Sequence, residues 1–369
     1  MLQLLYDIKK NKDRKFFKLK LAHKHLDIKK ITDFDIIIAP PTGPECISTS
    51  GFDYAFIEEY IDIDKHNNTK IHPITFISSS FGAYKSTAII NTIVSKKDKL
   101  STFYEKAIDM KYTKSSTPES LESMMKSLRE SIIPNTEIEN VINHKNIQII
   151  IWVARLKPIY NRIHIYIQYV IFTILGLVSI YVPSILHEYM FDRLCFYTGN
   201  IPNAIFPENY VTEFHKLTNK NYNQVLKASS CIPGITTSIN YIDGVGNGIF
   251  MDGAISDTHI GFKVSKKNRA IILNKTKNLN MNFFHKILKY PTIPKDFFEN
   301  LSIIHPTEYC KNNTPDKRLP TLTDWFDEDY VKNPEKRINN WNITKELSEK
   351  YLHSDIKRQL NQITSIFDD

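Results

Sequence analysis

Two short segments of the sequence carry the residue types that acyl-ester chemistry requires. In the segment 74–88, ITFISSSFGAYKSTA, an apolar run leads into three serines and then into a helical pattern. Ser80 lies at that turn, with the small residues Ser78 and Gly82 two positions before and after it. A nucleophile elbow has this layout, because its strained turn admits only small neighbours. The alternative is that Ser80 only caps the helix that follows.

The predicted elbow would place Ser80 at the start of a helix over Phe81–Val94. Backbone N–H groups and the helix dipole at such a position stabilise the negative oxygen that forms during ester hydrolysis. We therefore expect the N–H group of Phe81 to be one oxyanion donor.

Asp252 ends the apolar run 249–252 and is followed by Gly253 and Ala254 in a predicted turn. A carboxylate at a strand end can be aimed at a serine hydroxyl and take its proton. An aspartate before glycine is also a common turn residue, so a structural role is the alternative. We expect Asp252 to be the general base for Ser80.

Hydrophobic periodicity predicts the elements that would position these groups. We expect strands at 35–39, 74–78, 147–154, 193–197, 249–252, 269–274 and 301–305, and helices at 19–30, 52–60, 81–94, 118–131, 223–229 and from about 336. The early alternation of strand and helix is typical of an α/β fold with a mainly parallel central sheet and helices on both faces.

Together these motifs resemble those of the patatin-like phospholipase family. In that family the elbow is followed by an A-S-x-x-I-P segment and a D-G-[GA] motif, as at residues 228–233 and 252–254. A bacterial branch with G-G-P-K-G, G-A-S-I-G and D-G-G-I-T-D-Y-H motifs is more similar still. Its motifs are matched at residues 42–46, 50–56, 78–85, 252–259, 319–326 and 337–341. The resemblance covers the chain from about residue 20 to about residue 355.

The resemblance implies a patatin-like three-layer sandwich and a Ser–Asp dyad, with Ser80 as nucleophile, Asp252 as base and no metal or other cofactor. His259 matches a family position, and we expect it to line the site. A triad with His187 or His259 is the alternative. The resemblance also implies that the oxyanion is held by Phe81 and by a loop of four residues, Gly43, Pro44, Glu45 and Cys46.

That loop departs from the family pattern at two positions. Glu45 replaces a basic residue and brings negative charge near a developing anion, and Cys46 replaces a glycine. A Cβ atom at position 46 restricts the backbone that would aim an N–H group at the oxyanion. Ser78 also replaces a glycine, whereas Ser80 and Asp252 are both retained. We expect an active acyl hydrolase, and the alternative is a catalytically impaired lipid-binding protein of the same fold.

Composition narrows the choice of partners and compartment. Lys and Arg outnumber Asp and Glu by 48 to 40, and this excess is spread along the chain without zinc-finger spacing or an Arg-rich arm. We expect a lipid or other acyl-ester substrate and a membrane surface rather than nucleic acid. Residues 1–15 contain no apolar signal region and the cysteines form no CxxC pair. This indicates a cytoplasmic protein, peripheral to the membrane, with reduced and mostly buried thiols.

The longest apolar run, 165–185, could span a bilayer by its length. A single crossing would separate Ser80 from Asp252, so we expect a buried or cap helix, with docking on a membrane surface as the alternative. We divide the chain into three parts. They are a basic lead-in at 1–30, a hydrolase domain at 31–310 with an apolar insertion at about 155–190, and a C-terminal helical extension at 311–369.

Overall fold

The computed structural model describes residues 15–20, 28–65, 73–111, 116–162, 167, 170, 171, 174, 189–200, 212–232, 235–255, 268–274 and 301–367. Structural statements below refer to this part of the chain.

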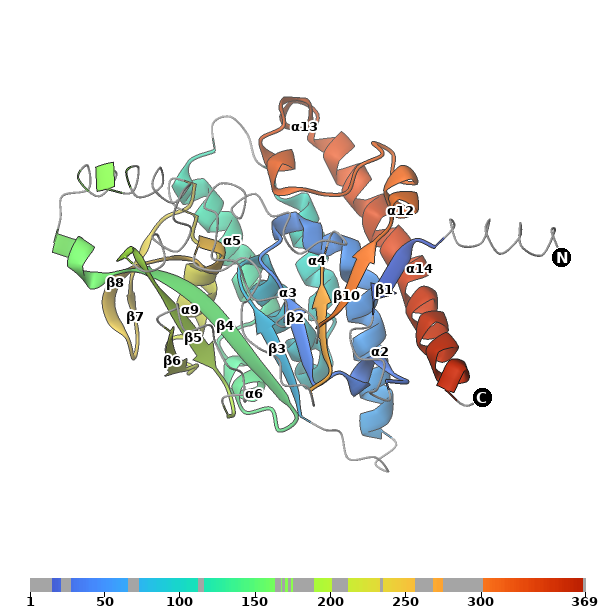
Figure 1. The fold of residues 1–369 in the computed structure, drawn as a ribbon. Coiled ribbons are helices and arrows are strands. Elements are labelled where there is room, and N and C mark those ends of the chain that lie inside the picture. The colour runs from blue at the N-terminus through green and yellow to red at the C-terminus, as the bar shows by residue number, and fades with distance from the viewer. Residues whose placement is uncertain are drawn as a thin grey trace.

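The centre of the molecule is one mixed sheet of ten strands in the described residues (Figure 1). The strands are β1 (Phe17–Lys20), β2 (Ile36–Ala39), β3 (Ile74–Ser78), β4 (Ile147–Leu156), β5 (Phe191–Tyr197), β6 (Thr212–Lys216), β7 (Ile239–Ile242), β8 (Gly246–Asp252), β9 (Ala270–Leu273) and β10 (Leu301–Pro306). Their order is β1-β10-β9-β2-β3-β4-β5-β6, and β8 pairs with both β4 and β7.

Strand direction changes from the centre of the sheet to its edges. The five strands β10, β9, β2, β3 and β4 are parallel. β1 is antiparallel to β10, and β5 and β8 are both antiparallel to β4. The predicted α/β class is therefore confirmed, and the expected parallel arrangement holds for the central strands of a sheet that is mixed as a whole.

Helices occupy most of the remaining described chain. They are α2 (Ser50–Lys65), α3 (Phe81–Ser95), α4 (Lys99–Asp109), α5 (Pro118–Ile132), α6 (Ile138–Ile142), α9 (Tyr222–Ser229), α12 (Glu308–Asn312), α13 (Glu328–Lys332) and α14 (Pro334–Phe367). Short 3₁₀ helices are η1 (Ile31–Asp33), η2 (Gly43–Thr49), η3 (Pro158–Arg162), η4 (Gly253–Ile255) and η6 (Leu322–Trp325).

Alternate side chains of the central strands enter two apolar clusters on opposite faces of the sheet. Ile37 and Phe76 belong to the larger cluster, together with residues of α2, α3, α4 and α14. Ile36, Ile38 and Ile77 belong to the second cluster, whose described members are strand residues. Both faces of these strands are thus buried, which explains why β2 is a continuous apolar run in the sequence and β3 a largely apolar one. Helices on the second face stay a prediction.

The predicted helix at 19–30 is wrong at both ends, since residues 28–30 are not helical and Lys30 has an extended backbone. Leu19 and Lys20 belong to β1, which pairs with β10 over Ile303–Pro306. The N–H groups of Phe17 and Leu19 donate to Asp355 and Gln359 of α14. These partners come from the far end of the chain, so the local sequence carries no sign of them.

Most of the apolar run 165–185 lies outside the described residues. At its described positions Ile167, Val170 and Ile174 the side chains are more than half exposed, so the expectation of a fully buried helix is wrong. Among the helices that the structure describes, none is long and apolar enough to cross a membrane. The four cysteines are buried and form no disulfide, in agreement with the buried thiols predicted from their spacing.

Candidate active site

One long strand, β4, brings Ser80 and Asp252 together. Along one edge of β4, β3 pairs in parallel as far as Ile151, and β8 pairs antiparallel with Val153 and the residues after it. Ser78 lies opposite Ile151, and Asp252 lies opposite Val153. The strands β3 and β8 therefore end close to each other. Ser80, two residues after β3, and Asp252, the last residue of β8, are thereby brought together, although they are 172 positions apart in the chain.

Ser80 and Asp252 are in direct contact. The Ser80 hydroxyl donates a hydrogen bond to Asp252 Oδ2 at 2.6 Å, and both residues are buried. Ser80 has φ 53° and ψ −138°, a conformation that residues with a side chain rarely adopt. The structure thus places the expected nucleophile on a strained strand-to-helix turn, with the expected base beside it.

Two glycines allow this close approach. A Cβ atom at Gly82 would lie 2.1 Å from the carbonyl oxygen of Ala39. A Cβ atom at Gly253 would lie 2.2 Å from Ser79 Oγ and 2.3 Å from a ring carbon of Trp152. All three distances are far shorter than any carbon contact allows, so neither position accepts a side chain without displacement. Ser78, by contrast, is accommodated in β3, where its hydroxyl donates to the carbonyl oxygen of Ile150 at 3.4 Å.

The carboxylate of Asp252 is held by two donors. Ser80 bonds to one oxygen, and the N–H group of Ala254 donates to the other at 2.8 Å. Burial raises the pKa of Asp252 to about 6, while the two hydrogen bonds oppose this rise by stabilising the ionised form. A carboxyl group with this pKa is ionised at neutral pH and is more basic than an ordinary aspartate, which suits a general base.

The loop after β2 offers fewer oxyanion donors than the four residues expected. Pro44 has no N–H group, and the N–H group of Glu45 donates to the carbonyl oxygen of Thr42 at 3.3 Å. Gly43 has φ +56°, which favours glycine. Within the described part of the chain, the N–H groups of Gly43 and Phe81 have no acceptor. These two groups remain available to an oxyanion.

The residues that depart from the family pattern in this loop are buried in η2. The backbone of Cys46 does not have a positive φ, and its side chain packs in the larger apolar cluster. Burial raises the pKa of its thiol to about 12, so the sulfur stays protonated. Glu45 is buried in the same turn. Cys46 therefore fits the helical backbone of η2 without strain.

A buried ion pair next to η2 is a feature that the sequence analysis missed. Lys85 Nζ lies 3.3 Å from Asp53 Oδ2 and donates to Thr49 Oγ1 at 3.1 Å. The hydroxyl of Tyr104 also donates to Asp53. Burial raises the pKa of Asp53, and Lys85 opposes that rise. Asp53 and Lys85 each lie in a segment that resembles a family motif, at 50–56 and 78–85. Nothing in the sequence indicated that their side chains would form an ion pair.

Several expected features lie outside the described residues. They include His259 and His187, so the structure does not place either histidine relative to Ser80. At the described positions, no group of three or more His, Cys, Asp or Glu side chains could hold a metal ion.

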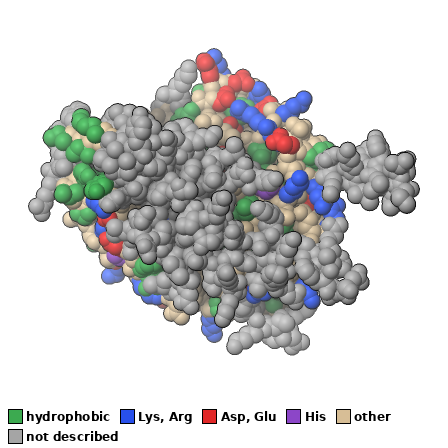
Figure 2. All heavy atoms as spheres, viewed as in Figure 1, with side chains coloured by type: hydrophobic (Ala, Val, Ile, Leu, Met, Phe, Trp, Pro, Cys, Tyr) green, Lys and Arg blue, Asp and Glu red, His purple; other side chains and the backbone are tan. Residues whose placement is uncertain are grey.

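Apolar side chains are exposed between β4 and β5. Five of them are more than half exposed, namely Ile159, Ile167, Val170, Ile174 and Tyr189. The spacing of residues 167, 170 and 174 puts them on one face of a helix. Figure 2 shows hydrophobic side chains gathered at its upper left, where Figure 1 places this segment. Because η3 follows the carboxyl end of β4, this apolar surface lies at the edge of the sheet where β3 leads into Ser80.

No protein-family model, curated protein or solved structure matches this chain. The fold and the site define the class of this protein. It is an α/β protein with a buried Ser–Asp pair at a strained strand-to-helix turn.

Proposed function

We propose that this chain is a patatin-like serine acyl hydrolase that cleaves lipid esters through a Ser–Asp dyad. The observation that carries the proposal is the 2.6 Å hydrogen bond from Ser80 to Asp252, made by a serine with φ 53°. Backbone strain of this kind costs about 1–3 kcal/mol and is concentrated at functional sites. A helix cap needs neither that strain nor a buried carboxylate as partner, so the catalytic interpretation explains more of the geometry.

The reaction needs two proton transfers in each of two steps. Asp252 takes the proton of Ser80 as its Oγ attacks the carbonyl carbon of the ester, and the N–H groups of Gly43 and Phe81 donate to the resulting oxyanion. The alcohol leaves with the proton from Asp252, which leaves an acyl group on Ser80. Water then attacks this acyl-enzyme while Asp252 takes a proton from it, and Asp252 returns that proton to Ser80 Oγ as the carboxylic acid leaves.

A lipid ester is favoured as the substrate by the exposed apolar residues between β4 and β5. Apolar side chains on one face of a helix bind at the boundary of headgroups and acyl chains. The exposure of Ile167, Val170 and Ile174, in the segment that follows β4, supports such binding. We propose that this surface brings the site to a membrane from the side, without spanning it.

The second candidate is a lipid-binding protein of the same fold that does not turn over its ligand. It is favoured by the loop η2, where Pro44 has no N–H group and Glu45 uses its own within the turn. Loss of one oxyanion donor lowers the rate by about 10²–10³-fold.

Turnover separates the two candidates. We would incubate the purified protein with short-chain esters and phospholipid vesicles, beside Ser80→Ala and Asp252→Asn. Ser79→Ala and Asp243→Asn are matched controls, because they remove a neighbouring hydroxyl and a carboxylate of the β7–β8 hairpin. Hydrolysis that survives in the controls and falls by about 10³-fold or more in the two variants supports the hydrolase. A folded wild type that binds vesicles without hydrolysis supports the binding protein.

A further inference from the structure

A single turn near the C-terminus packs against Gly43 and Phe81, the two residues whose N–H groups we assign to the oxyanion. Leu322 begins η6, and its Cδ1 atom lies 3.4 Å from the position of a Cβ atom at Gly43. Trp325 ends η6, and its ring centroid lies 5.5 Å from that of Phe81. In Figure 1 this segment lies at the same end of the sheet as η2. The C-terminal extension is therefore packed against the proposed site.

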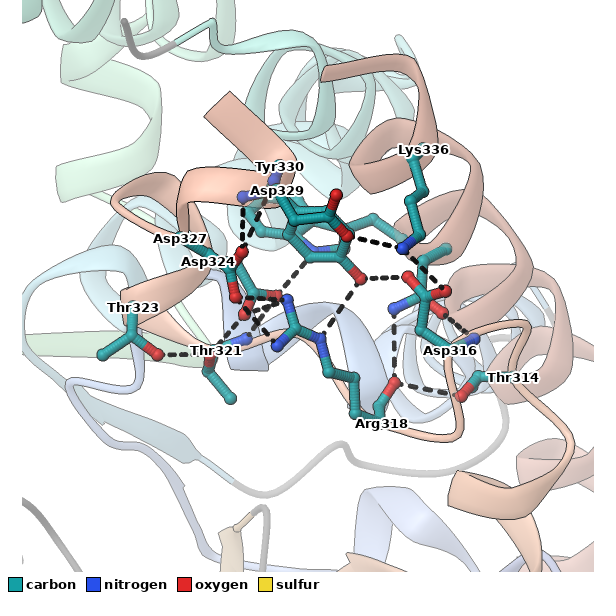
Figure 3. A network of polar contacts seen from close by, with 12 residues as sticks. Thr314, Asp316, Arg318, Thr321, Thr323, Asp324, Asp327, Asp329, Tyr330 and Lys336 are labelled. Atoms are coloured by element: carbon teal, nitrogen blue, oxygen red, sulfur yellow. Dashed lines mark hydrogen bonds and ion pairs between the residues drawn. The ribbon is translucent and has the colours of Figure 1, made fainter. Parts of the chain in front are cut away.

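A buried carboxylate fixes this turn (Figure 3). Asp324 Oδ1 accepts a hydrogen bond from the Thr321 hydroxyl at 2.6 Å and lies 3.3 Å from Arg318. Asp324 Oδ2 accepts from the indole N–H group of Trp341 at 3.1 Å. Since Trp341 belongs to α14 and is fully buried, the turn is tied to the core of the protein.

Arg318 extends the same network to α13. Its guanidinium lies 3.2 Å from Asp327 and 4.2 Å from the centroid of the Tyr330 ring, and the Tyr330 hydroxyl donates to Asp316. Figure 3 shows Asp327, Tyr330 and Asp316 grouped around the Arg318 side chain, beside Asp324. The turn is thus held on both sides, by α14 and by α13.

We propose that Leu322 and Trp325 are positioning residues, which hold the N–H groups of Gly43 and Phe81 in the arrangement that an oxyanion requires. This inference rests on the proposed function. Gly43 has no side chain with which to pack, so its position depends on what lies against it, and in this structure that is Leu322. Misplacement of a reacting or stabilising group by about 1 Å can lower a rate by about 10²-fold.

The test measures backbone exchange together with activity. We would compare the wild type with Leu322→Ala and Trp325→Ala, and use Phe326→Ala as the control, because Phe326 is the next residue and is 53% exposed. Hydrogen–deuterium exchange at the amides of residues 43–49 and 80–84 should become about tenfold faster in the two variants. It should stay at the wild-type rate in the control, and Trp325→Phe should restore slow exchange.

Ester kinetics give the second readout. In both variants kcat should fall by about 10-fold or more, with KM nearly unchanged, because the oxyanion forms only after binding. Unchanged exchange at residues 43–49 and 80–84 in both variants would overturn the inference, whatever the activity of the wild type. Faster exchange beside an inactive wild type would support the positioning role and contradict the proposed function. If Leu322→Ala loses protection across the whole sheet, Leu322→Val is measured instead, and the same outcomes decide.

Discussion

Lys85 and Asp53 form an ion pair 3.3 Å apart, with side chains that are 2% and 0% exposed. The pair joins α3 to α2, and the hydrogen bond from Lys85 to Thr49 adds η2. The helix that begins after Ser80 is thereby connected to the turn that contains Gly43. Charges at this depth are tolerated only while each has its partner.

Removal of one member of the ion pair should therefore lower the free energy of unfolding more than removal of both members. Lys85→Met leaves Asp53 buried without a cation, and we expect it to lower the free energy of unfolding by about 3–5 kcal/mol. The double variant Asp53→Asn/Lys85→Met carries no unpaired charge and should be more stable than Lys85→Met alone. Urea denaturation of the wild type, Lys85→Met, Asp53→Asn and the double variant gives the interaction energy between the two side chains. A double variant that is less stable than Lys85→Met would contradict this view of the pair.

The strain at Ser80 predicts an unusual order of stability for two small substitutions. Alanine is normally more stable than glycine by about 0.5–1 kcal/mol within a regular element. At φ 53° and ψ −138° the Cβ atom is the source of strain, so we expect Ser80→Gly to be more stable than Ser80→Ala by about 1 kcal/mol. Both variants lack the hydroxyl, so the lost hydrogen bond to Asp252 cancels in the comparison. Thermal unfolding of the pair measures the difference, and the ordinary order would argue against a strained turn.

The pKa of Asp252 predicts a stability that depends on pH. Its pKa is raised from 3.8 to about 6 by burial, so between these pH values the native state binds more protons than the unfolded state. The stabilisation by the protonated carboxyl group is therefore lost as the pH rises from about 4 to about 6. At about 1.4 kcal/mol per pKa unit, ionisation of the buried Asp252 lowers the free energy of unfolding at pH 8 by about 3 kcal/mol relative to its value at low pH.

Asp252→Asn removes this cost. We expect the variant to be more stable than the wild type at pH 8 and to lose most of that advantage at pH 4. Unfolding in urea at both pH values measures the change, with Asp243→Asn as the control for loss of one negative charge. An advantage of equal size at both pH values would contradict the raised pKa.

The same carboxyl group should set the lower limit of the pH range for activity. Asp252 accepts a proton only when it is ionised, so the rate of attack by Ser80 should rise with pH and reach half its maximum near pH 6. The measurement is the pH dependence of kcat/KM for a neutral short-chain ester, whose own charge does not change. A rate that is constant from pH 5 to pH 8 would contradict a base with a pKa near 6.

The fold near the site could be predicted from the sequence because its strands are buried on both faces. The run at 36–39 is continuously apolar and the run at 74–78 is largely so, and each adjoins a proline, so their position is evident locally. β1 has no such signal. Its four residues, FKLK, lie in a Lys-rich stretch, and they form a strand because β10 and α14 supply partners that are remote in the sequence.

The two central residues of the site could also be predicted, since Ser80 and Asp252 each lie in a distinctive local motif. Their contact could not be derived from those motifs, because it depends on β3 ending opposite Ile151 and β8 ending opposite Val153 along the same edge of β4. The contacts of Leu322 and Trp325 with the site could not be derived from local motifs either. They depend on how the C-terminal turn packs, and no local pattern indicates it.

The most direct test of the dyad is the reaction of the protein with a fluorophosphonate, followed by intact mass measurement and peptide mapping. We predict that one phosphonyl group is transferred to Ser80 with loss of fluoride, and that labelling disappears in Ser80→Ala and falls by about 10³-fold or more in Asp252→Asn. Ser79→Ala should be labelled like the wild type. A folded wild type that stays unlabelled, or a label that maps to another residue and persists in Ser80→Ala, would contradict the assignment of Ser80 as the nucleophile.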